Sequence, residues 1–460
     1  MKKIARALSY SFFKIAIQNQ WYGLIAWFYS KVIDEVTAEG KTVRFSKKLK
    51  DDKIVVLVLS AYAFRGDSEC LAASRELRIL QIPYHWQTRL FYFFYKHEET
   101  CCFKGVKLFK YIEEEDSCYQ YKKAHMDFLY GFLPKLYKNL GIKCVISPHI
   151  RYMGDVDWGS VSKKIGVPYI LINRDSRFTA STFGRNFMIE TLKSLAKFEG
   201  THMIVQSELD RQLCIECDYV PADKISSLGC MRMDGFLRRI KTVRSTISSR
   251  KKIVFFPFNH PSTKLILKNT KHATFAQEKS AISQFFVDVN VLLARLAINY
   301  PEIDVIMKPK SKRATWNKEV DVVFKESGIY QHEIPNLHIE PYLDVQDLVL
   351  DADVFCGLNT SALLEVAVAE KPVIVPYFKE IQKTVFGEMA FFRESYHLFD
   401  IAESIEDLES LILHRLNNPR IDGKIMEGRK IMFEKYFSSL NCDATEKHIE
   451  CIKRVVSQCK

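Results

Sequence analysis

The segment 351–376 constrains the fold of this chain more than any other, because it has the pattern of strand, polar turn, helix and strand in one short window. The apolar stretch 354–356 is followed by polar residues at 359–361, whose side chains can cap a helix. A Lys-Pro pair at 371–372 ends that helix, and the β-branched stretch 373–375 is typical of a buried parallel strand. The segment therefore predicts a βαβ unit, in which helices cover a parallel sheet.

The turn inside this unit is also a candidate anion site. The first backbone N–H groups of a helix have no intrahelical acceptor, and the helix dipole favours a negative charge there. Asn359, Thr360 and Ser361 add polar side chains to the same turn, and Glu365 follows one helical turn later. We expect the turn to hold a phosphate and Glu365 to reach a sugar hydroxyl of the same ligand.

Length and composition indicate a globular protein of two domains. The chain has 460 residues, which exceeds the size at which a single core keeps growing. Its composition is 47% hydrophobic and 27% charged. Twelve cysteines are scattered along the chain without a secretory leader, which favours reduced thiols and a cytoplasmic location.

The basic N-terminal segment, residues 1–45, is predicted to be helical and amphipathic. Residues 1–50 contain ten Lys or Arg against three Asp or Glu, together with several aromatic residues, and the whole chain has a net charge of +12. Such a segment resembles an anchor that lies on the inner face of the cytoplasmic membrane. A helix that packs on its own domain with a solvated basic face is the alternative. No apolar run approaches the length of about 20 residues that spans a bilayer, and no motif indicates a nucleic-acid partner.

Short apolar stretches alternate with segments of helical length and divide the chain into two Rossmann-like halves. In the first, residues 46–240, strands are expected at 53–59, 144–147, 168–173 and 202–206. A basic linker at 241–252 leads to the second, residues 253–425, with strands at 253–256, 303–307, 337–339, 354–356 and 373–375. Helices at 426–460 are expected to pack back on the first domain.

Polar residues follow several of these strands, at the end of the sheet where α/β domains bind ligands. Asn259 and His260 follow the first strand of the second half, and His260 could contact a phosphate or transfer a proton. Lys308 and Lys310 follow the next strand, where two cations suit a nucleotide phosphate.

Carboxylates are the candidate catalytic groups. Asp234 lies just before the linker, two residues after Arg232, and is a candidate nucleophile, base or salt-bridge partner. Asp175 follows the strand at 168–173 and could instead cap the next helix. The Asp-x-Asp tripeptides at 155–157 and 351–353 and the Cys-x-x-Cys at 214–217 are too short to assign a metal.

These motifs together resemble bacterial surface-polysaccharide glycosyltransferases of the GT-B type, which have two Rossmann-like domains facing across a cleft. The likeness is carried by Gly229-x-x-Arg232-x-Asp234, Asn259-His260-Pro, Lys308-Pro-Lys310 and Asn359-Thr360-Ser361-x-x-x-Glu365. Within that group the chain is most similar to transferases that use CMP-activated 3-deoxy-octulosonic acid (Kdo). That resemblance implies that Asp234 is the nucleophile, that Asp175 replaces a general acid, and that His260, Lys308, Lys310, Thr360 and Ser361 hold the CMP phosphate. It implies no cofactor beyond the nucleotide-sugar co-substrate.

The sequence therefore predicts a metal-independent glycosyltransferase that transfers a sugar to a surface polysaccharide or a lipid-linked glycan. Three alternatives stay open: a CDP-glycerol-type polyol-phosphate transferase, a nucleotide-sugar 2-epimerase, and a non-catalytic glycan- or lipid-binding scaffold. Loops of the P-loop, Gly-x-Gly-x-x-Gly and Gly-x-Ser-x-Gly types are absent from the sequence, which disfavours P-loop NTPases, dehydrogenases and α/β-hydrolases.

Overall fold

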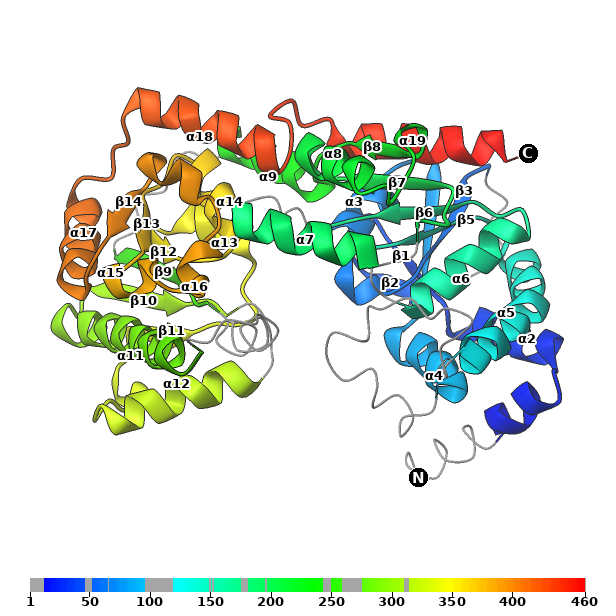
Figure 1. The fold of residues 1–460 in the computed structure, drawn as a ribbon, viewed down its shortest axis with the longest axis horizontal. Helices are drawn as coiled ribbons and strands as arrows, with labels where there is room; N and C mark the ends of the chain where they lie inside the picture. The colour runs from blue at the N-terminus through cyan, green and yellow to red at the C-terminus, as the bar shows by residue number, and fades with distance from the viewer. Residues whose placement is uncertain are drawn as a thin grey trace. The chain divides into compact units, whose positions relative to one another are not determined.

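The chain forms two compact units in a computed structural model (Figure 1). The first unit comprises Met1–Ser176, Ile189–Gly235 and Asn441–Lys460, and the second comprises Arg177–Met188 and Phe236–Leu440. The structure describes residues 12–45, 52–64, 66–95, 119–148, 150, 153–174, 181–194, 197–242, 250–258, 275–309 and 314–459.

The first unit is built on an eight-stranded sheet in the order β2-β1-β4-β3-β5-β6-β7-β8. The pairs from β4 through β8 are parallel, while β1 pairs antiparallel with both β2 and β4. The strands are β1 (Asp34–Val36), β2 (Thr42–Arg44), β3 (Ile54–Val58), β4 (Leu77–Gln81), β5 (Ile142–Ser147), β6 (Tyr169–Ile172), β7 (His202–Val205) and β8 (Ile225–Ser227).

This sheet is buried on both faces, as its continuous apolar strands predict. Leu57 and Leu80 belong to one core cluster, whereas their neighbours Val56 and Val58 belong to another. The helices of the first unit are α2 (Tyr22–Val32), α3 (Asp67–Ala72), α4 (Tyr84–Phe94), α5 (Tyr119–Leu140), α6 (Met153–Lys164), α8 (Glu208–Glu216) and α19 (Ala444–Gln458). Both α7 (Thr182–Ser194) and α9 (Met231–Thr242) contain residues of both units.

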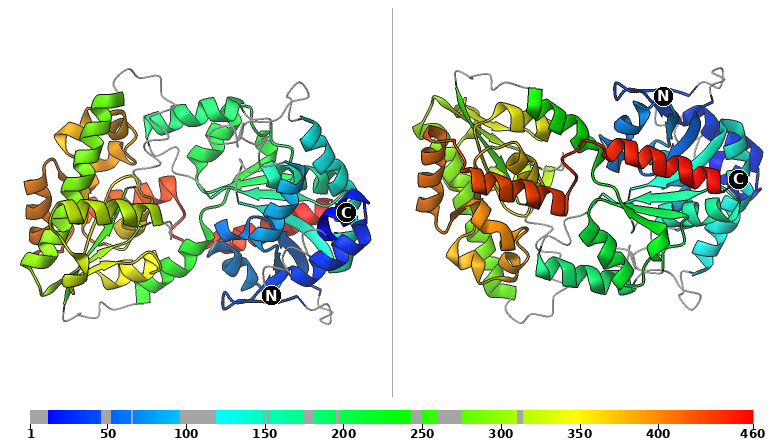
Figure 2. Two further views of the ribbon diagram at one scale, coloured as in Figure 1. Left: turned by 90° about the horizontal axis from the view of Figure 1, so that it is seen from below. Right: turned by 90° about the horizontal axis from the view of Figure 1, so that it is seen from above.

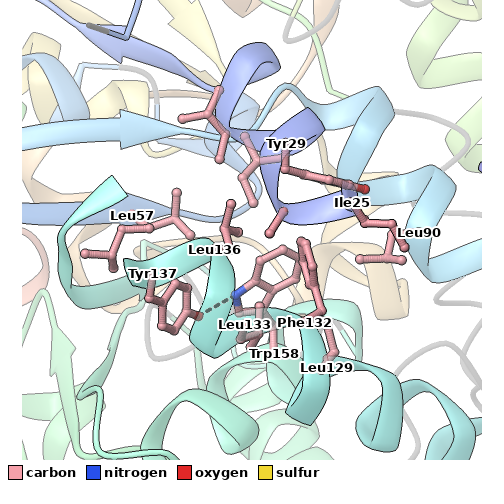
Figure 3. Packing of buried hydrophobic residues seen from close by; sticks show 14 of the residues in the cluster. Ile25, Tyr29, Leu57, Leu90, Leu129, Phe132, Leu133, Leu136, Tyr137 and Trp158 are labelled. Atoms are coloured by element: carbon pink, nitrogen blue, oxygen red, sulfur yellow. Dashed lines mark hydrogen bonds between the residues drawn. The ribbon is translucent and has the colours of Figure 1, made fainter. Parts of the chain in front are cut away.

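The first core cluster joins the N-terminal helices, which are α2 and the helical residues 12–18 before it, to the sheet (Figure 3). Tyr29 of α2 is fully buried and lies 5.2 Å, between ring centroids, from Phe132 of α5. The indole N–H of Trp158 donates a hydrogen bond of 2.7 Å to the hydroxyl of Tyr137, so the polar atom of this large buried ring has a partner. The inner face of α2 is therefore part of the core of this unit.

The second core cluster contains the C-terminal helix α19. Cys451, Ile452 and Val455 pack with Val56 and Ile146 of the sheet, and Figure 2 shows α19 running along the first unit. The sequence predicted that both C-terminal helices pack on the first domain, but this holds only for α19. Helix α18 (Gly423–Tyr436) lies in the second unit against α14 (Ala362–Val368), because Arg429 and Phe433 of α18 are buried there.

The second unit contains a six-stranded sheet in which every neighbouring pair is parallel. The order is β11-β10-β9-β12-β13-β14, which is the Rossmann order 3-2-1-4-5-6. The strands are β9 (Lys251–Phe256), β10 (Ile303–Met307), β11 (Leu337–Ile339), β12 (Val354–Gly357), β13 (Val373–Pro376) and β14 (Asp400–Ala402). Its remaining helices are α11 (Phe275–Asn299), α12 (Ala314–Glu326), α13 (Val345–Asp351), α15 (Lys379–Gln382), α16 (Val385–Glu388) and α17 (Ile405–Asn417).

Helix α11 corrects one expectation about apolar segments. Its residues 280–299 are long and apolar enough to cross a membrane, although they form no uninterrupted apolar run. In the structure 61% of that stretch is buried within the protein, where α11 packs against β10, α12 and α17. The core helix of a folded domain can be equally long and apolar, and the contacts of α11 are those of a core helix.

The predicted fold class, α/β with two Rossmann-like domains, is confirmed by the two sheets and their order. The predicted linker falls partly outside the described residues, at 243–249. The chain passes from the first unit to the second within α9, between Gly235 and Phe236.

Candidate functional site

The strand order of the second unit marks one position as the candidate ligand site. Along the chain the sheet grows from β9 to β11 in one direction and from β12 to β14 in the other. The loops that leave β9 and β12 therefore diverge, and open α/β sheets bind ligands in the crevice formed at this point. The polar turn identified in the sequence follows β12, so the topology places it at this crevice.

The start of that turn is held close to β9. A Cβ on Gly357 would lie 3.2 Å from Cβ of Phe256 and 3.3 Å from its carbonyl oxygen. Asn359 has a left-handed backbone, with φ of 57°, and its side-chain oxygen accepts a hydrogen bond of 2.9 Å from the backbone N–H of Phe391. Asn359 thus fixes the shape of the turn, in addition to any contact with a ligand.

The two hydroxyls that follow have few contacts of their own. The Thr360 hydroxyl accepts a hydrogen bond of 3.2 Å from the backbone N–H of Ala362. Ser361 is the N-cap residue of α14, but its side chain makes no capping hydrogen bond. Both residues are half-buried, whereas Glu365, one turn later, is 5% exposed. The hydroxyls are therefore better placed than the Glu365 carboxylate to reach a ligand.

Lys308 brings a positive charge to the same edge of the sheet, at the end of β10. Its side chain is 8% exposed, and its ammonium group donates to the carbonyl oxygens of Pro309 at 3.1 Å and Pro341 at 3.3 Å. A buried ammonium group needs such acceptors to remain charged.

Four of the predicted residues, Asn259, His260, Lys310 and Asp175, lie outside the described residues.

Asp234 and Arg232 belong to a separate group in the first unit. The buried Asp234 carboxylate accepts hydrogen bonds from the backbone N–H groups of Ala444 at 3.2 Å and Thr445 at 2.7 Å. These are orphan donors at the start of α19, so Asp234 caps a helix that begins 210 residues later. Asp443, the N-cap residue by position, makes no side-chain capping hydrogen bond.

The backbone N–H of Arg232 donates to Asp67 Oδ1 at 3.3 Å, and Asp67 Oδ2 is paired with Arg174 Nε at 2.5 Å. Arg232 is therefore connected, through Asp67, to Arg174, which lies two residues after β6. The structure thus brings Arg232 and Asp234 to the first unit, and Lys308, Asn359, Thr360, Ser361 and Glu365 to the second.

We expect the Asp234→Ala variant to lose about 1–2 kcal/mol of stability, because two buried N–H groups of α19 lose their acceptor. Urea unfolding followed by circular dichroism measures the change. Asp443→Ala is the matched control at the same helix start. Its side chain forms a half-exposed pair with Lys447 at 2.9 Å, so its loss should stay below about 1 kcal/mol. Equal losses in the two variants would contradict the capping role of Asp234.

A second polar cluster was missed in the sequence, at the point in the first sheet where β3 and β5 are neighbours. One oxygen of Asp155, Oδ1, accepts hydrogen bonds from the Ser60 hydroxyl at 2.9 Å and from the Gln87 amide at 2.5 Å. The backbone N–H of Ser60 donates to Gln87 Oε1 at 2.8 Å. The other carboxylate oxygen, Oδ2, is buried and has no hydrogen-bond partner in the described part of the chain. Burial raises the pKa of Asp155 from 3.8 to about 7.

This shift predicts a pH-dependent contribution to stability. Because the folded pKa is raised, the contribution of Asp155 is fully present below about pH 4 and is lost as the pH rises through about 7. The isosteric Asp155→Asn variant removes this titration. We expect its free energy of unfolding, relative to wild type, to rise by about 3 kcal/mol between pH 5 and pH 8. Urea unfolding at the two pH values measures the difference, and a constant difference would show that Asp155 is ionised in the folded protein.

Metal chemistry has no evident site in the residues that the structure describes. No group of three or more His, Cys, Asp or Glu side chains in that part of the chain is placed to hold an ion. Asp157 instead contacts His125 at 2.8 Å and the Tyr95 hydroxyl at 2.9 Å, all within the core. Asp351 pairs with Lys252 at 2.6 Å, at the amino end of β12 and away from the polar turn.

Comparisons with known proteins give similar folds but no family. No family model matches the chain, and no curated protein has a matching sequence. Among solved structures, UDP-GlcNAc 2-epimerase from Methanocaldococcus jannaschii has a TM-score of 0.49 and 10% identity, covering 87% of this chain and 99% of its own. A UDP-forming trehalose-phosphate synthase from Burkholderia xenovorans has a TM-score of 0.46 and 10% identity, covering 88% and 99%. The wall teichoic acid polymerase TagF has a TM-score of 0.45 and 13% identity, covering 89% and 90%. Likenesses this distant assign no substrate to this chain.

Proposed function

We propose that this protein is a glycosyltransferase that takes its sugar from a nucleotide donor bound at the switch point of the second unit. The observation that carries the proposal is that Lys308 follows β10 while Thr360 and Ser361 follow β12, both at the carboxyl edge of a sheet with the Rossmann strand order. Hydroxyls, helix N–H groups and a lysine are the groups that hold a nucleotide phosphate. The motif resemblance makes CMP-Kdo our best candidate for the donor.

Sugar transfer requires mainly that the two substrates are positioned and that the charge on the leaving group is stabilised. Transfer forms a bond between the anomeric carbon and an acceptor hydroxyl oxygen, which loses its proton. It breaks the bond between the anomeric carbon and the donor phosphate, so negative charge develops on the departing nucleotide. Lys308 and the hydroxyl-bearing turn would stabilise that charge, since fixed cations and donors act strongly in a partly buried site. His260 and Asp175 are our candidates for proton transfer.

In this proposal Asp234 is not the nucleophile that the resemblance implies. Both of its oxygens accept hydrogen bonds from the start of α19. A nucleophile needs a free lone pair directed at the anomeric carbon, and these hydrogen bonds lower its reactivity. We therefore assign Asp234 a positioning role, in which it fixes α19 on the first unit.

Turnover of three donors tests the proposal. The purified protein is incubated with CMP-Kdo, CDP-glycerol or UDP-GlcNAc, each with and without a fraction of lipid-linked glycans. Acceptor-dependent release of CMP from CMP-Kdo is the expected result. Acceptor-dependent use of CDP-glycerol would indicate a polyol-phosphate transferase, and conversion of UDP-GlcNAc without acceptor would indicate an epimerase. No turnover of any donor would favour a non-catalytic scaffold.

A further inference from the structure

The N-terminal helices of the first unit have apolar side chains on two faces. Their inner face is core: Phe13, Ile17, Ile25 and Tyr29 are at most 8% exposed. The opposite side is also apolar but has no covering element among the described residues. It consists of Phe12 (45% exposed), Ile15 (49%), Trp21 (46%), Leu24 (38%) and Trp27 (55%), which we call the outer face.

The spacing of these residues makes them a continuous strip along each helix. Trp21, Leu24 and Trp27 follow one another at three-residue steps, as do Phe12 and Ile15, and residues three apart lie on the same side of a helix. Two of the five tryptophans of the chain are thus about half exposed, Trp27 on α2 and Trp21 at its N-cap position. Exposed large apolar side chains are common singly, but a clustered set indicates a binding surface.

The charged residues of the helices that bear the outer face are basic. Residues 1–33 contain five basic residues and no Asp or Glu. Two of the five, Lys14 and Lys31, are exposed on the described helices, and the Lys31 ammonium lies 5.9 Å from the centre of the Trp27 ring. The other three, Lys2, Lys3 and Arg6, lie outside the described residues.

We propose that the outer face docks on an anionic lipid bilayer. Tryptophan, phenylalanine and leucine on one side of a helix, flanked by lysines, suit the boundary between lipid headgroups and acyl chains. The two exposed lysines favour anionic lipid over a second copy of this chain, because a symmetric dimer would place four of them around one interface. Only five side chains enter the lipid, so the association is weak and reversible.

Vesicle sedimentation of the full-length protein tests this surface. Vesicles of phosphatidylcholine with phosphatidylglycerol should bind the protein more strongly than vesicles of phosphatidylcholine alone. The Trp21→Ser/Trp27→Ser variant should bind at least about tenfold more weakly, because two exposed indoles no longer enter the interface. The Lys14→Gln/Lys31→Gln variant should lose roughly 30-fold on the anionic vesicles.

Val322→Ser/Ile431→Ser is the matched control, because these side chains are 53% and 60% exposed on α12 and α18 of the second unit. Its binding should equal that of the wild type. The proposal would be overturned if the tryptophan variant bound anionic vesicles as strongly as the wild type does. It would also be overturned if the wild type bound both kinds of vesicle equally. A third contradicting result would be a wild-type protein that is dimeric in size-exclusion chromatography and a tryptophan variant that is monomeric. The assay contains no donor, so its result is independent of the proposed transferase activity.

Discussion

The Thr360→Val/Ser361→Ala variant is expected to bind its nucleotide at least about 100-fold more weakly than the wild-type protein. Each hydroxyl would donate a hydrogen bond to a charged phosphate oxygen, and such bonds contribute about 1.5–3 kcal/mol each. Stability should change little. The Thr360 hydroxyl accepts one long hydrogen bond from the backbone N–H of Ala362, and the Ser361 side chain makes no capping hydrogen bond. Isothermal titration of both proteins with the nucleotide measures the loss.

Ser404→Ala is the control for this prediction, since Ser404 also precedes a helix at the carboxyl edge of the same sheet. Its hydroxyl accepts a hydrogen bond of 3.2 Å from the backbone N–H of Asp407 and caps α17. That variant should lose about 1 kcal/mol of stability and keep its nucleotide affinity. If the two variants bound nucleotide equally well, the turn after β12 would not be the phosphate site.

The Arg429→Met variant is expected to lose about 3 kcal/mol of stability. Arg429 is 1% exposed, and its guanidinium donates to the carbonyl oxygens of Leu398 and Lys371, each at 2.9 Å. It also lies 5.4 Å from the centre of the Phe399 ring. Burial lowers the pKa of Arg429 to about 10, so the group stays charged at neutral pH. Methionine fills much of the space but removes the donor from one buried and one partly buried carbonyl group.

Urea unfolding followed by circular dichroism measures this loss, with Arg420→Met as the control on the exposed segment before α18. Replacing an exposed arginine there should change stability by no more than about 0.5 kcal/mol. A loss below about 1 kcal/mol for Arg429→Met would mean that water or another donor satisfies the two carbonyl groups.

The strands that could be predicted from the sequence are those whose apolar side chains are continuous, such as β9 and β12. The strands β1 and β4 were missed because a buried ion pair hides their pattern. Arg78 of β4 is 5% exposed and donates two hydrogen bonds, of 2.9 and 2.7 Å, to the carboxylate of Glu35 in β1. Each strand alone contains a charge typical of a loop, and only their pairing makes both charges acceptable in a sheet.

In the candidate site, too, features formed by neighbouring residues could be predicted, whereas contacts between distant parts of the chain could not. The turn at 359–361 is a local feature, and the sequence predicted it together with its helix and flanking strands. The partners of Asp234 lie 210 residues later, and those of Asp155 come from two other elements. Contacts between distant parts of the chain leave no local pattern, so the capping role of Asp234 could not be predicted.

Thermal stabilisation of the wild-type protein by CMP, CDP, UDP, GDP and ADP at equal concentrations tests the nucleotide-donor proposal most directly. A ligand that binds only the folded state raises the melting temperature, and a concentration of 100 Kd adds about 2.7 kcal/mol. We expect CMP to raise the melting temperature most, and the Thr360→Val/Ser361→Ala variant to lose the effect. A preference for UDP or GDP would contradict the Kdo donor but keep a nucleotide site, whereas no shift with any of the five nucleotides would contradict the nucleotide site itself.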